Sequence, residues 1–181
     1  WTQQAKLVAS DAATNNHLGN SVAISGDTIV AGAPAADAPS FSSGAAYVFT
    51  RTAGVWSEQQ KLIPNDPQVL AEFGGAVAIS NNTAVFGARN HDPGTGSGTG
   101  AAYVFLRTGV SWAQEQKLTA SDGAASDYYG LSVAIDTDTV VIGAYEHDTI
   151  AGADAGQAYV YKRTGVTWTE SQILTANDAS L

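Results

Sequence analysis

The stretch Gly44-Ala-Ala-Tyr-Val-Phe49 returns twice along the chain, as Gly100-Ala-Ala-Tyr-Val-Phe105 and Gly156-Gln-Ala-Tyr-Val-Tyr161. Other features return in the same register, including a Gly-Ala pair and an Arg-Thr pair. The tryptophans Trp1, Trp56, Trp112 and Trp168 are 55, 56 and 56 residues apart. A fixed period of this length indicates a repeat architecture. We therefore divide the chain into units at 1–55, 56–111 and 112–167, with a partial unit at 168–181.

Within one unit, the alternation of residue types is that of β-strands. Residues 21–24 and 28–31 are short β-branched segments on either side of a Ser-Gly-Asp turn signal, so we expect a hairpin. Residues 46–49 place Tyr47 and Phe49 on one face and small residues on the other, as a strand packed on both sides requires. Residues 55–62 are polar in the middle, which is typical of an outer edge strand.

Four antiparallel strands recurring at this period predict an all-β fold of β-propeller blades. A β-sandwich is the competing fold, but sandwiches do not repeat their sequence at blade length. The four tryptophan-bearing strands exceed the three copies of the other strands, so we expect one extra outer strand. Closed propellers need about four to eight blades. We therefore expect a part of a larger propeller, or one shared with other copies through exposed strand edges.

Composition narrows the classes of partner. The chain is 44% hydrophobic and carries seventeen acidic against eight basic residues, a formal charge of −9. This charge repels phosphate backbones, so nucleic acid is not an expected partner. No apolar run is long enough to cross a bilayer, so we expect no membrane insertion. The absence of cysteine excludes disulfides and thiolate chemistry.

Several motifs resemble the FG-GAP repeat of integrin-α-like propellers. They are Phe73-Gly74 followed by Gly87-Ala88, and Gly32-Ala33-Pro34 in the first unit. The Gly-Ala-Ala-Tyr-Val-Phe block and the Trp…Gln-Lys-Leu strand resemble a bacterial subgroup of that family. The resemblance implies a propeller that is secreted or displayed on the cell surface and that serves adhesion or ligand binding.

The family's calcium loop is the main departure from this resemblance. Integrin-type repeats carry several aspartates between the first two strands, where carboxylates surround the ion. The corresponding turns here are Ser25-Gly26-Asp27-Thr28, Ser80-Asn81-Asn82-Thr83 and Asp136-Thr137-Asp138-Thr139. They are too short and too poor in oxygen ligands for that site, so we expect no cofactor. Asp27, Asn82 and Asp138 are better explained as turn residues.

Antiparallel connectivity places the long, divergent loops at 34–43, 89–99 and 145–155 on one face, where binding functions commonly lie. His91-Asp92 and His147-Asp148 occupy equivalent positions there, and an imidazole beside a carboxylate is suited to metal binding or acid–base chemistry. The alternative is that they shape the loops, since the first unit has Ala36 and Asp37 instead. Tyr128 and Tyr145 are candidates for stacking on a sugar.

The remaining repeated polar residues have structural interpretations. Asp11, Asp66, Asp122 and Asp178 recur in the connection between units and are expected to hold a turn. Arg51, Arg107 and Arg163 recur at the last turn of each unit, and each is expected to pair with a nearby carboxylate or carbonyl between blades. The sequence contains no Gly-x-Ser-x-Gly elbow, no His-Glu-x-x-His pair and no phosphate-binding glycine loop followed by a helix. We therefore expect a non-catalytic extracellular module for binding, adhesion or assembly, with a protein or glycan ligand; the alternative is a lectin-like propeller.

Overall fold

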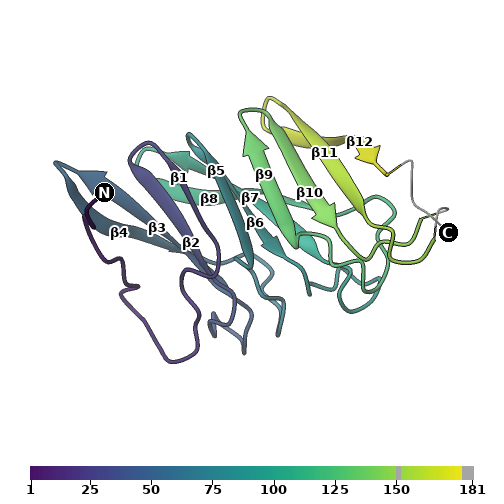
Figure 1. Cartoon of the computed structure of the whole chain (residues 1–181), viewed down its shortest axis with the longest axis horizontal. Helices are drawn as coiled ribbons and strands as arrows, with labels where there is room; N and C mark the ends of the chain where they lie inside the picture. The colour runs from purple at the N-terminus through teal and green to yellow at the C-terminus, as the bar shows by residue number, and fades with distance from the viewer. Residues whose placement is uncertain (150–151, 177–181) are drawn as a thin grey trace.

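The chain folds into three antiparallel sheets, each with four strands in sequential order. The computed structural model describes residues 1–149 and 152–176. We call the sheets blades 1, 2 and 3. Blade 1 contains β1(Val22–Ser25), β2(Thr28–Ala33), β3(Ala45–Thr52) and β4(Val55–Leu62); blade 2 contains β5(Ala76–Ser80), β6(Thr83–Ala88), β7(Ala101–Thr108) and β8(Ser111–Leu118); blade 3 contains β9(Ser132–Asp136), β10(Thr139–Ala144), β11(Gln157–Thr164) and β12(Thr167–Leu174). Figure 1 shows the blades standing side by side.

The strands predicted in the first unit are all present. The Ser-Gly-Asp turn joins β1 to β2, and Gly26 takes the left-handed conformation that the turn needs, with φ 57°. β3 pairs with β4 from Ala46↔Leu62 to Thr52↔Val55, and a bulge interrupts the register next to Phe49. β4 is the last strand of its sheet, and its residues before Leu62 are exposed or partly buried, which confirms the outer edge strand.

Each blade has two chemically different faces. The aliphatic face of blade 1 consists of Ala23, Val30, Ala46, Val48 and Leu62, and it packs on the aromatic face of blade 2, which consists of Phe73, Val77, Ile79, Phe86, Tyr103, Phe105 and Trp112. The same arrangement joins blades 2 and 3, where Val85, Ala102, Val104 and Leu118 meet Tyr129, Ile142, Tyr159, Tyr161 and Trp168. The core is therefore a stack of aliphatic-to-aromatic interfaces between consecutive blades.

Glycines let the backbones of neighbouring blades touch. A Cβ atom at Gly32 would overlap the carbonyl oxygen of Gly74, and one at Gly87 would overlap that of Gly130. Gly74 itself has φ 85°, a conformation that other residues rarely adopt. The recurrent Phe-Gly and Gly-Ala pairs thus mark the contact point between one blade and the next.

The predicted extra outer strand is wrong. Among the described residues, no strand precedes Val22. The first residues instead run along the aromatic face of blade 1, where Leu7 and Ala9 join a cluster with Tyr47 and Phe49. A strand needs a partner for its backbone hydrogen bonds, and this segment packs its side chains on the face of blade 1, without a strand partner among the described residues.

The long loops gather on one side, as predicted. In blades 1 and 2, the loop after the second strand runs parallel to the connection that enters the next blade. Phe73 N–H donates to the Ser43 carbonyl at 3.0 Å, and Tyr129 N–H donates to the Thr99 carbonyl at 3.1 Å. The short turns lie at the opposite ends of the strands (Figure 1). The described residues contain no helix with the length and hydropathy that a membrane crossing requires.

Candidate functional site

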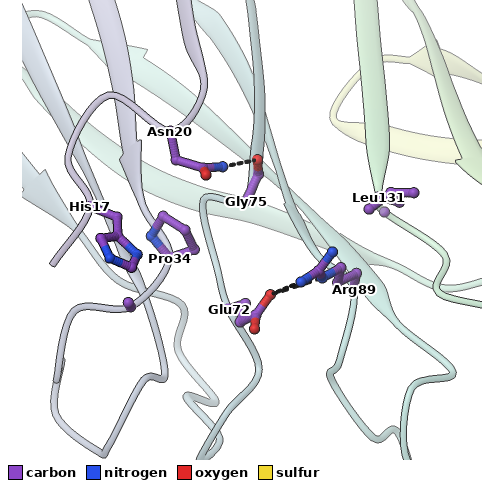
Figure 2. Close-up of a pocket in the computed structure, with 9 residues that line it drawn as sticks. His17, Asn20, Pro34, Glu72, Gly75, Arg89 and Leu131 are labelled. Atoms are coloured by element: carbon purple, nitrogen blue, oxygen red, sulfur yellow. Dashed lines mark hydrogen bonds and ion pairs between the residues drawn. The ribbon is translucent and has the colours of Figure 1, made fainter. Parts of the chain in front are cut away.

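A pocket opens on the loop side and is shared by all three blades. Its volume is about 320 Å³. Blade 1 and its preceding segment supply one wall, the entry to blade 2 supplies the middle, and the entry to blade 3 closes the far end (Figure 2). The lining residues used below are His17, Asn20, Pro34, Glu72, Arg89 and Leu131.

Two positions of the repeat lie on the loop side of each blade, and those of blades 1 and 2 line this pocket. The first position lies two residues before the recurrent glycine, which is Gly19, Gly74 or Gly130. The second position directly follows the Gly-Ala pair. In blade 2 they hold Glu72 and Arg89, whose carboxylate and guanidinium lie 2.8 Å apart. In blade 3 they hold Tyr128 and Tyr145, whose rings stack with centroids 5.7 Å apart. In blade 1 they hold His17 and Pro34. We call these the variable pairs.

The first member of each variable pair has an unusual backbone. His17, Glu72 and Tyr128 have φ values of 57°, 58° and 52°, in the left-handed region that residues other than glycine and asparagine seldom occupy. Each of these residues begins a turn, in which its carbonyl accepts a hydrogen bond from the N–H of the residue three positions later. For Tyr128 that N–H belongs to Leu131, at 3.0 Å. The repeat therefore holds the backbone constant while the side chain changes.

Blade contacts also support the floor of the pocket. The Asn20 side-chain amide donates to the carbonyl of Gly75 at 3.0 Å, which ties the segment before blade 1 to the start of blade 2 (Figure 2). The side chains of Arg89 and Glu72 remain 44% and 29% exposed. Both charges are therefore still accessible to a ligand.

His91, one of the predicted site residues, is buried in blade 2. Its Nδ1 lies 3.2 Å from the Tyr103 hydroxyl, and its Nε2 lies 2.7 Å from the Lys117 ammonium. Burial lowers the pKa of His91, and the positive charge of Lys117 lowers it further. A neutral ring accepting from Lys117 fits this environment. The imidazole thus bonds side chains of β7 and β8 inside blade 2.

His147 holds the equivalent position in blade 3. Its Nδ1 lies 2.7 Å from a carboxylate oxygen of the buried Asp127, and its Nε2 lies 3.7 Å from Asp122. Only 7% of the residue is exposed. Both predicted histidines are therefore engaged by internal partners, away from the open pocket.

Asp92 and Asp148, the predicted neighbours of these histidines, organise their own loops. Asp92 accepts the N–H groups of Gly94 and Gly96, at 2.7 and 3.0 Å. These hydrogen bonds lower the pKa of Asp92. Asp148 accepts the N–H of Asp154 at 2.9 Å, and Asp37 accepts that of Ser42 at 2.8 Å in the first blade. One aspartate thus closes the same loop in every blade.

The recurrent aspartates between units also bind internal groups. Asp11 accepts from the Tyr47 hydroxyl at 2.7 Å and from Lys61 at 2.6 Å, and the bond with Lys61 lowers its pKa most. Burial raises the pKa of Asp66, but Lys117 at 2.8 Å outweighs it and the net pKa is lowered. Asp122 accepts from the Tyr159 hydroxyl at 2.7 Å. Asp178 lies outside the described residues.

The repeated arginines all pair with oxygens, but the predicted contact between blades is present only for Arg163, with Glu115, and for Arg107, which also donates to the Thr28 hydroxyl at 2.9 Å. Arg51 contacts Asp27 at 2.6 Å, Arg107 donates to Asn82 at 2.6 and 2.9 Å, and Arg163 contacts Glu115 at 2.7 Å. Each guanidinium also lies over the tryptophan of its own blade, at 5.2 to 5.7 Å from the ring centre. Within the described part of the chain, no group of three or more His, Asp or Glu residues has a geometry for holding a metal ion.

Of the six predicted site residues, none lines this pocket; Tyr145 and Asp148 are exposed, and Tyr128 is partly buried. Tyr145 is 52% exposed, and its pKa is raised, first by the carboxylate of Glu146. Sequence reasoning missed His17, Glu72 and Arg89 as partners in a pocket. The signal was present, because these residues vary at two fixed offsets from the recurrent glycines.

Comparisons with known proteins agree with this fold. The chain resembles the crystal structure of Saccharomyces cerevisiae Sqt1 with a TM-score of 0.56 and 8% identity, over 90% of this chain and 37% of that chain. The chain thus spans little more than a third of that structure. No curated protein matches it. The model of the FG-GAP repeat matches residues 1–49, 56–105 and 112–161, so this chain belongs to the FG-GAP repeat family.

Proposed function

We propose that this chain is a non-catalytic binding module that takes its ligand, a protein or a glycan, across the variable pairs of the loop side. The observation that carries the proposal is the contrast within each pair between a constant, strained backbone and a changing side chain. Strained conformations persist only where the surroundings over-determine them, and they cluster at functional sites. A rigid scaffold that presents variable side chains is the usual design of a binding surface.

The chemistry of the pairs favours a ligand that offers both charge and hydrogen bonds. Arg89 is planar and retains unpaired N–H groups beyond its contact with Glu72, so it is suited to a carboxylate on a protein ligand. Asn20 and His17 lie at the same pocket and add polar groups. The histidines that would serve acid–base chemistry are buried and bonded internally, which supports a role in binding.

A glycan ligand is the second candidate, and the stacked Tyr128 and Tyr145 favour it. Aromatic rings offer sugars a flat apolar surface, and Tyr145 is half exposed beside the Arg89 guanidinium. The resemblance to bacterial members of the family supports an extracellular place for either ligand. Immunolabelling of intact cells of the source organism tests that location.

Binding is tested by screening the purified chain against surface proteins of its source and against a glycan array. Arg89→Ala should weaken a protein ligand at least tenfold, and Tyr145→Ala should do the same for a glycan. Val166→Ala is the matched control, because Val166 is 72% exposed at a short turn away from the pocket. Binding that survives both pocket substitutions, or turnover that maps to the loops, would contradict the proposal.

A further inference from the structure

A second pocket lies on the loop side, at the entry to blade 3. Its volume is about 370 Å³, and it shares no lining residue with the pocket of Figure 2. Among the described residues that line it there is no lysine or arginine. Its titratable side chains are Asp122, Asp127, Glu146, His147, Asp148 and Asp154. Five carboxylates and one imidazole therefore surround this pocket.

The equivalent place in blade 2 is filled by an ammonium group. The Lys117 Nζ atom lies 2.8 Å from Oδ2 of Asp66 and 2.7 Å from Nε2 of His91. These two acceptor atoms are 3.7 Å apart, so the ammonium is held between them. In blade 1, Lys61 contacts Asp11 in the same way at 2.6 Å. The repeat thus builds a site for an ammonium group, and two blades fill it with a lysine of their own.

Blade 3 keeps this site but not the lysine. Asp122 and His147 stand one repeat after Asp66 and His91, and their Oδ2 and Nε2 atoms are again 3.7 Å apart. Ile173 stands one repeat after the lysine of blade 2, and its side chain packs against the core between blades 2 and 3. Within the described part of the chain, no ammonium contacts either acceptor atom.

Both acceptor atoms of blade 3 remain available to a ligand. Oδ1 of Asp122 accepts from the Tyr159 hydroxyl at 2.7 Å, whereas Oδ2 has no hydrogen bond among the described residues. His147 Nδ1 donates to the buried Asp127 carboxylate at 2.7 Å, so the neutral ring presents the lone pair of Nε2 to the pocket. The distance of 3.7 Å to Asp122 is too long for a hydrogen bond. Because only 7% of His147 is exposed, its surroundings hold the ring in this orientation.

The surroundings of the site have also become more acidic in blade 3. Three carboxylates occupy positions that are neutral one repeat earlier. They are Asp127, Glu146 and Asp154, in place of Ala71, Asn90 and Gly98. A concave site with charges of one sign attracts ligands of the opposite sign.

We propose that this pocket binds the primary ammonium group of a ligand in the place that Lys117 takes in blade 2. One N–H of the ammonium donates to Oδ2 of Asp122 and a second donates to Nε2 of His147. The ammonium is the chemical class that the repeat itself places between these two acceptors. A lysine side chain of a protein and a free alkylamine both offer it. The site is separate from the variable pairs, and its binding does not depend on theirs.

The direct test is an NMR titration of the isotope-labelled chain at pH 8, where alkylamines are charged. The probes are butylamine and the peptide acetyl-Gly-Lys-Gly-amide. Both should shift the signals of Asp122 and His147 to saturation, with a dissociation constant of about 1 mM or below. The same peptide with an acetylated lysine should cause no shift. Tighter binding of the peptide than of butylamine identifies a protein as the source of the ammonium, and equal affinities identify a free amine.

Two variants remove the site by different routes. Ile173→Lys supplies an internal ammonium, and Asp122→Asn removes the charge while it retains an acceptor for the Tyr159 hydroxyl; each should weaken butylamine binding at least tenfold. Val166→Lys and Asp136→Asn make the same changes of charge at exposed positions of the short turns and should bind as the parent does. If one pocket variant does not fold, the other still decides the question.

Three results would overturn the proposal. The first is an affinity for butylamine that is unchanged in both Ile173→Lys and Asp122→Asn. The second is the absence of saturation by about 10 mM amine, or shifts spread evenly over all acidic surfaces. The third is saturable binding of calcium chloride or zinc chloride at this pocket without binding of either amine.

Discussion

Blades 2 and 3 carry nearly the same residues on their aliphatic faces, yet one face is core and the other is surface. Val104 in β7 and Val160 in β11 are one repeat apart, and the first is fully buried while the second is partly exposed. The difference arises from the neighbour: blade 3 covers blade 2, and no described residue covers blade 3. Equivalent residues in a stack of repeats therefore contribute differently to the free energy of folding, because each unit contacts only its neighbours.

A charge placed on each face should give the largest contrast. Val85→Lys buries an uncompensated ammonium between blades 2 and 3 and should destabilise the fold by about 3–5 kcal/mol. Val141→Lys, one repeat later, can extend its ammonium into water and should cost less than about 1 kcal/mol. Urea unfolding followed by tryptophan fluorescence, in dilute protein, measures both. Equal costs would contradict the distinction between the faces.

Truncating a leucine should give the next largest difference. Leu118→Ala leaves a cavity in a closed interface and should cost about 2–4 kcal/mol. Leu174→Ala removes a side chain that is already 43% exposed, so a loss under about 1 kcal/mol is expected. The midpoints of thermal unfolding of the two variants provide the comparison. A Leu174 variant as unstable as the Leu118 variant would show that this face is covered.

The glutamine bridge should have a smaller effect. Gln116→Ala removes two hydrogen bonds to the Trp168 backbone and leaves its buried N–H and carbonyl without these partners, at a cost of about 1–2 kcal/mol. Gln172→Ala in blade 3 should be neutral within about 0.5 kcal/mol. Amide hydrogen exchange at Trp168 checks the mechanism, since only the Gln116 variant should accelerate it. Unchanged protection there would count against the bridge.

The smallest effect concerns pH. Burial lowers the pKa of His91 below its ordinary value of 6.5, so the unfolded chain binds a proton more readily than the folded one. Stability from this histidine is therefore full above pH 6.5 and is lost as the pH falls toward the folded pKa, by at most about 1.4 kcal/mol per pH unit. His91→Gln should flatten the stability profile between pH 7 and 5. Superimposable profiles for the parent and the variant would refute this account.

Sequence reasoning located the strands well and the site only in part. Alternation and turn residues predicted β1 to β4 within a few residues, because strand periodicity and turn conformation are local properties. The extra outer strand was wrong because, among the described residues, no strand pairs with the segment that begins at Trp1, although its sequence resembles those of β4, β8 and β12. The histidines were predicted as site residues because of their chemistry. Their burial against Tyr103 and Asp127 depends on tertiary contacts, which the sequence does not show.

The sequence by itself determined the repeat, the four-stranded blade and the aliphatic and aromatic sides of each strand, since these follow from a fixed period and from alternation along the chain. Only the tertiary structure decided which sides are covered, which segments meet at the pocket and that the first residues rest on blade 1. Those outcomes depend on contacts between residues a full repeat apart. Identical residues meet different neighbours there, so position in the stack decides their burial.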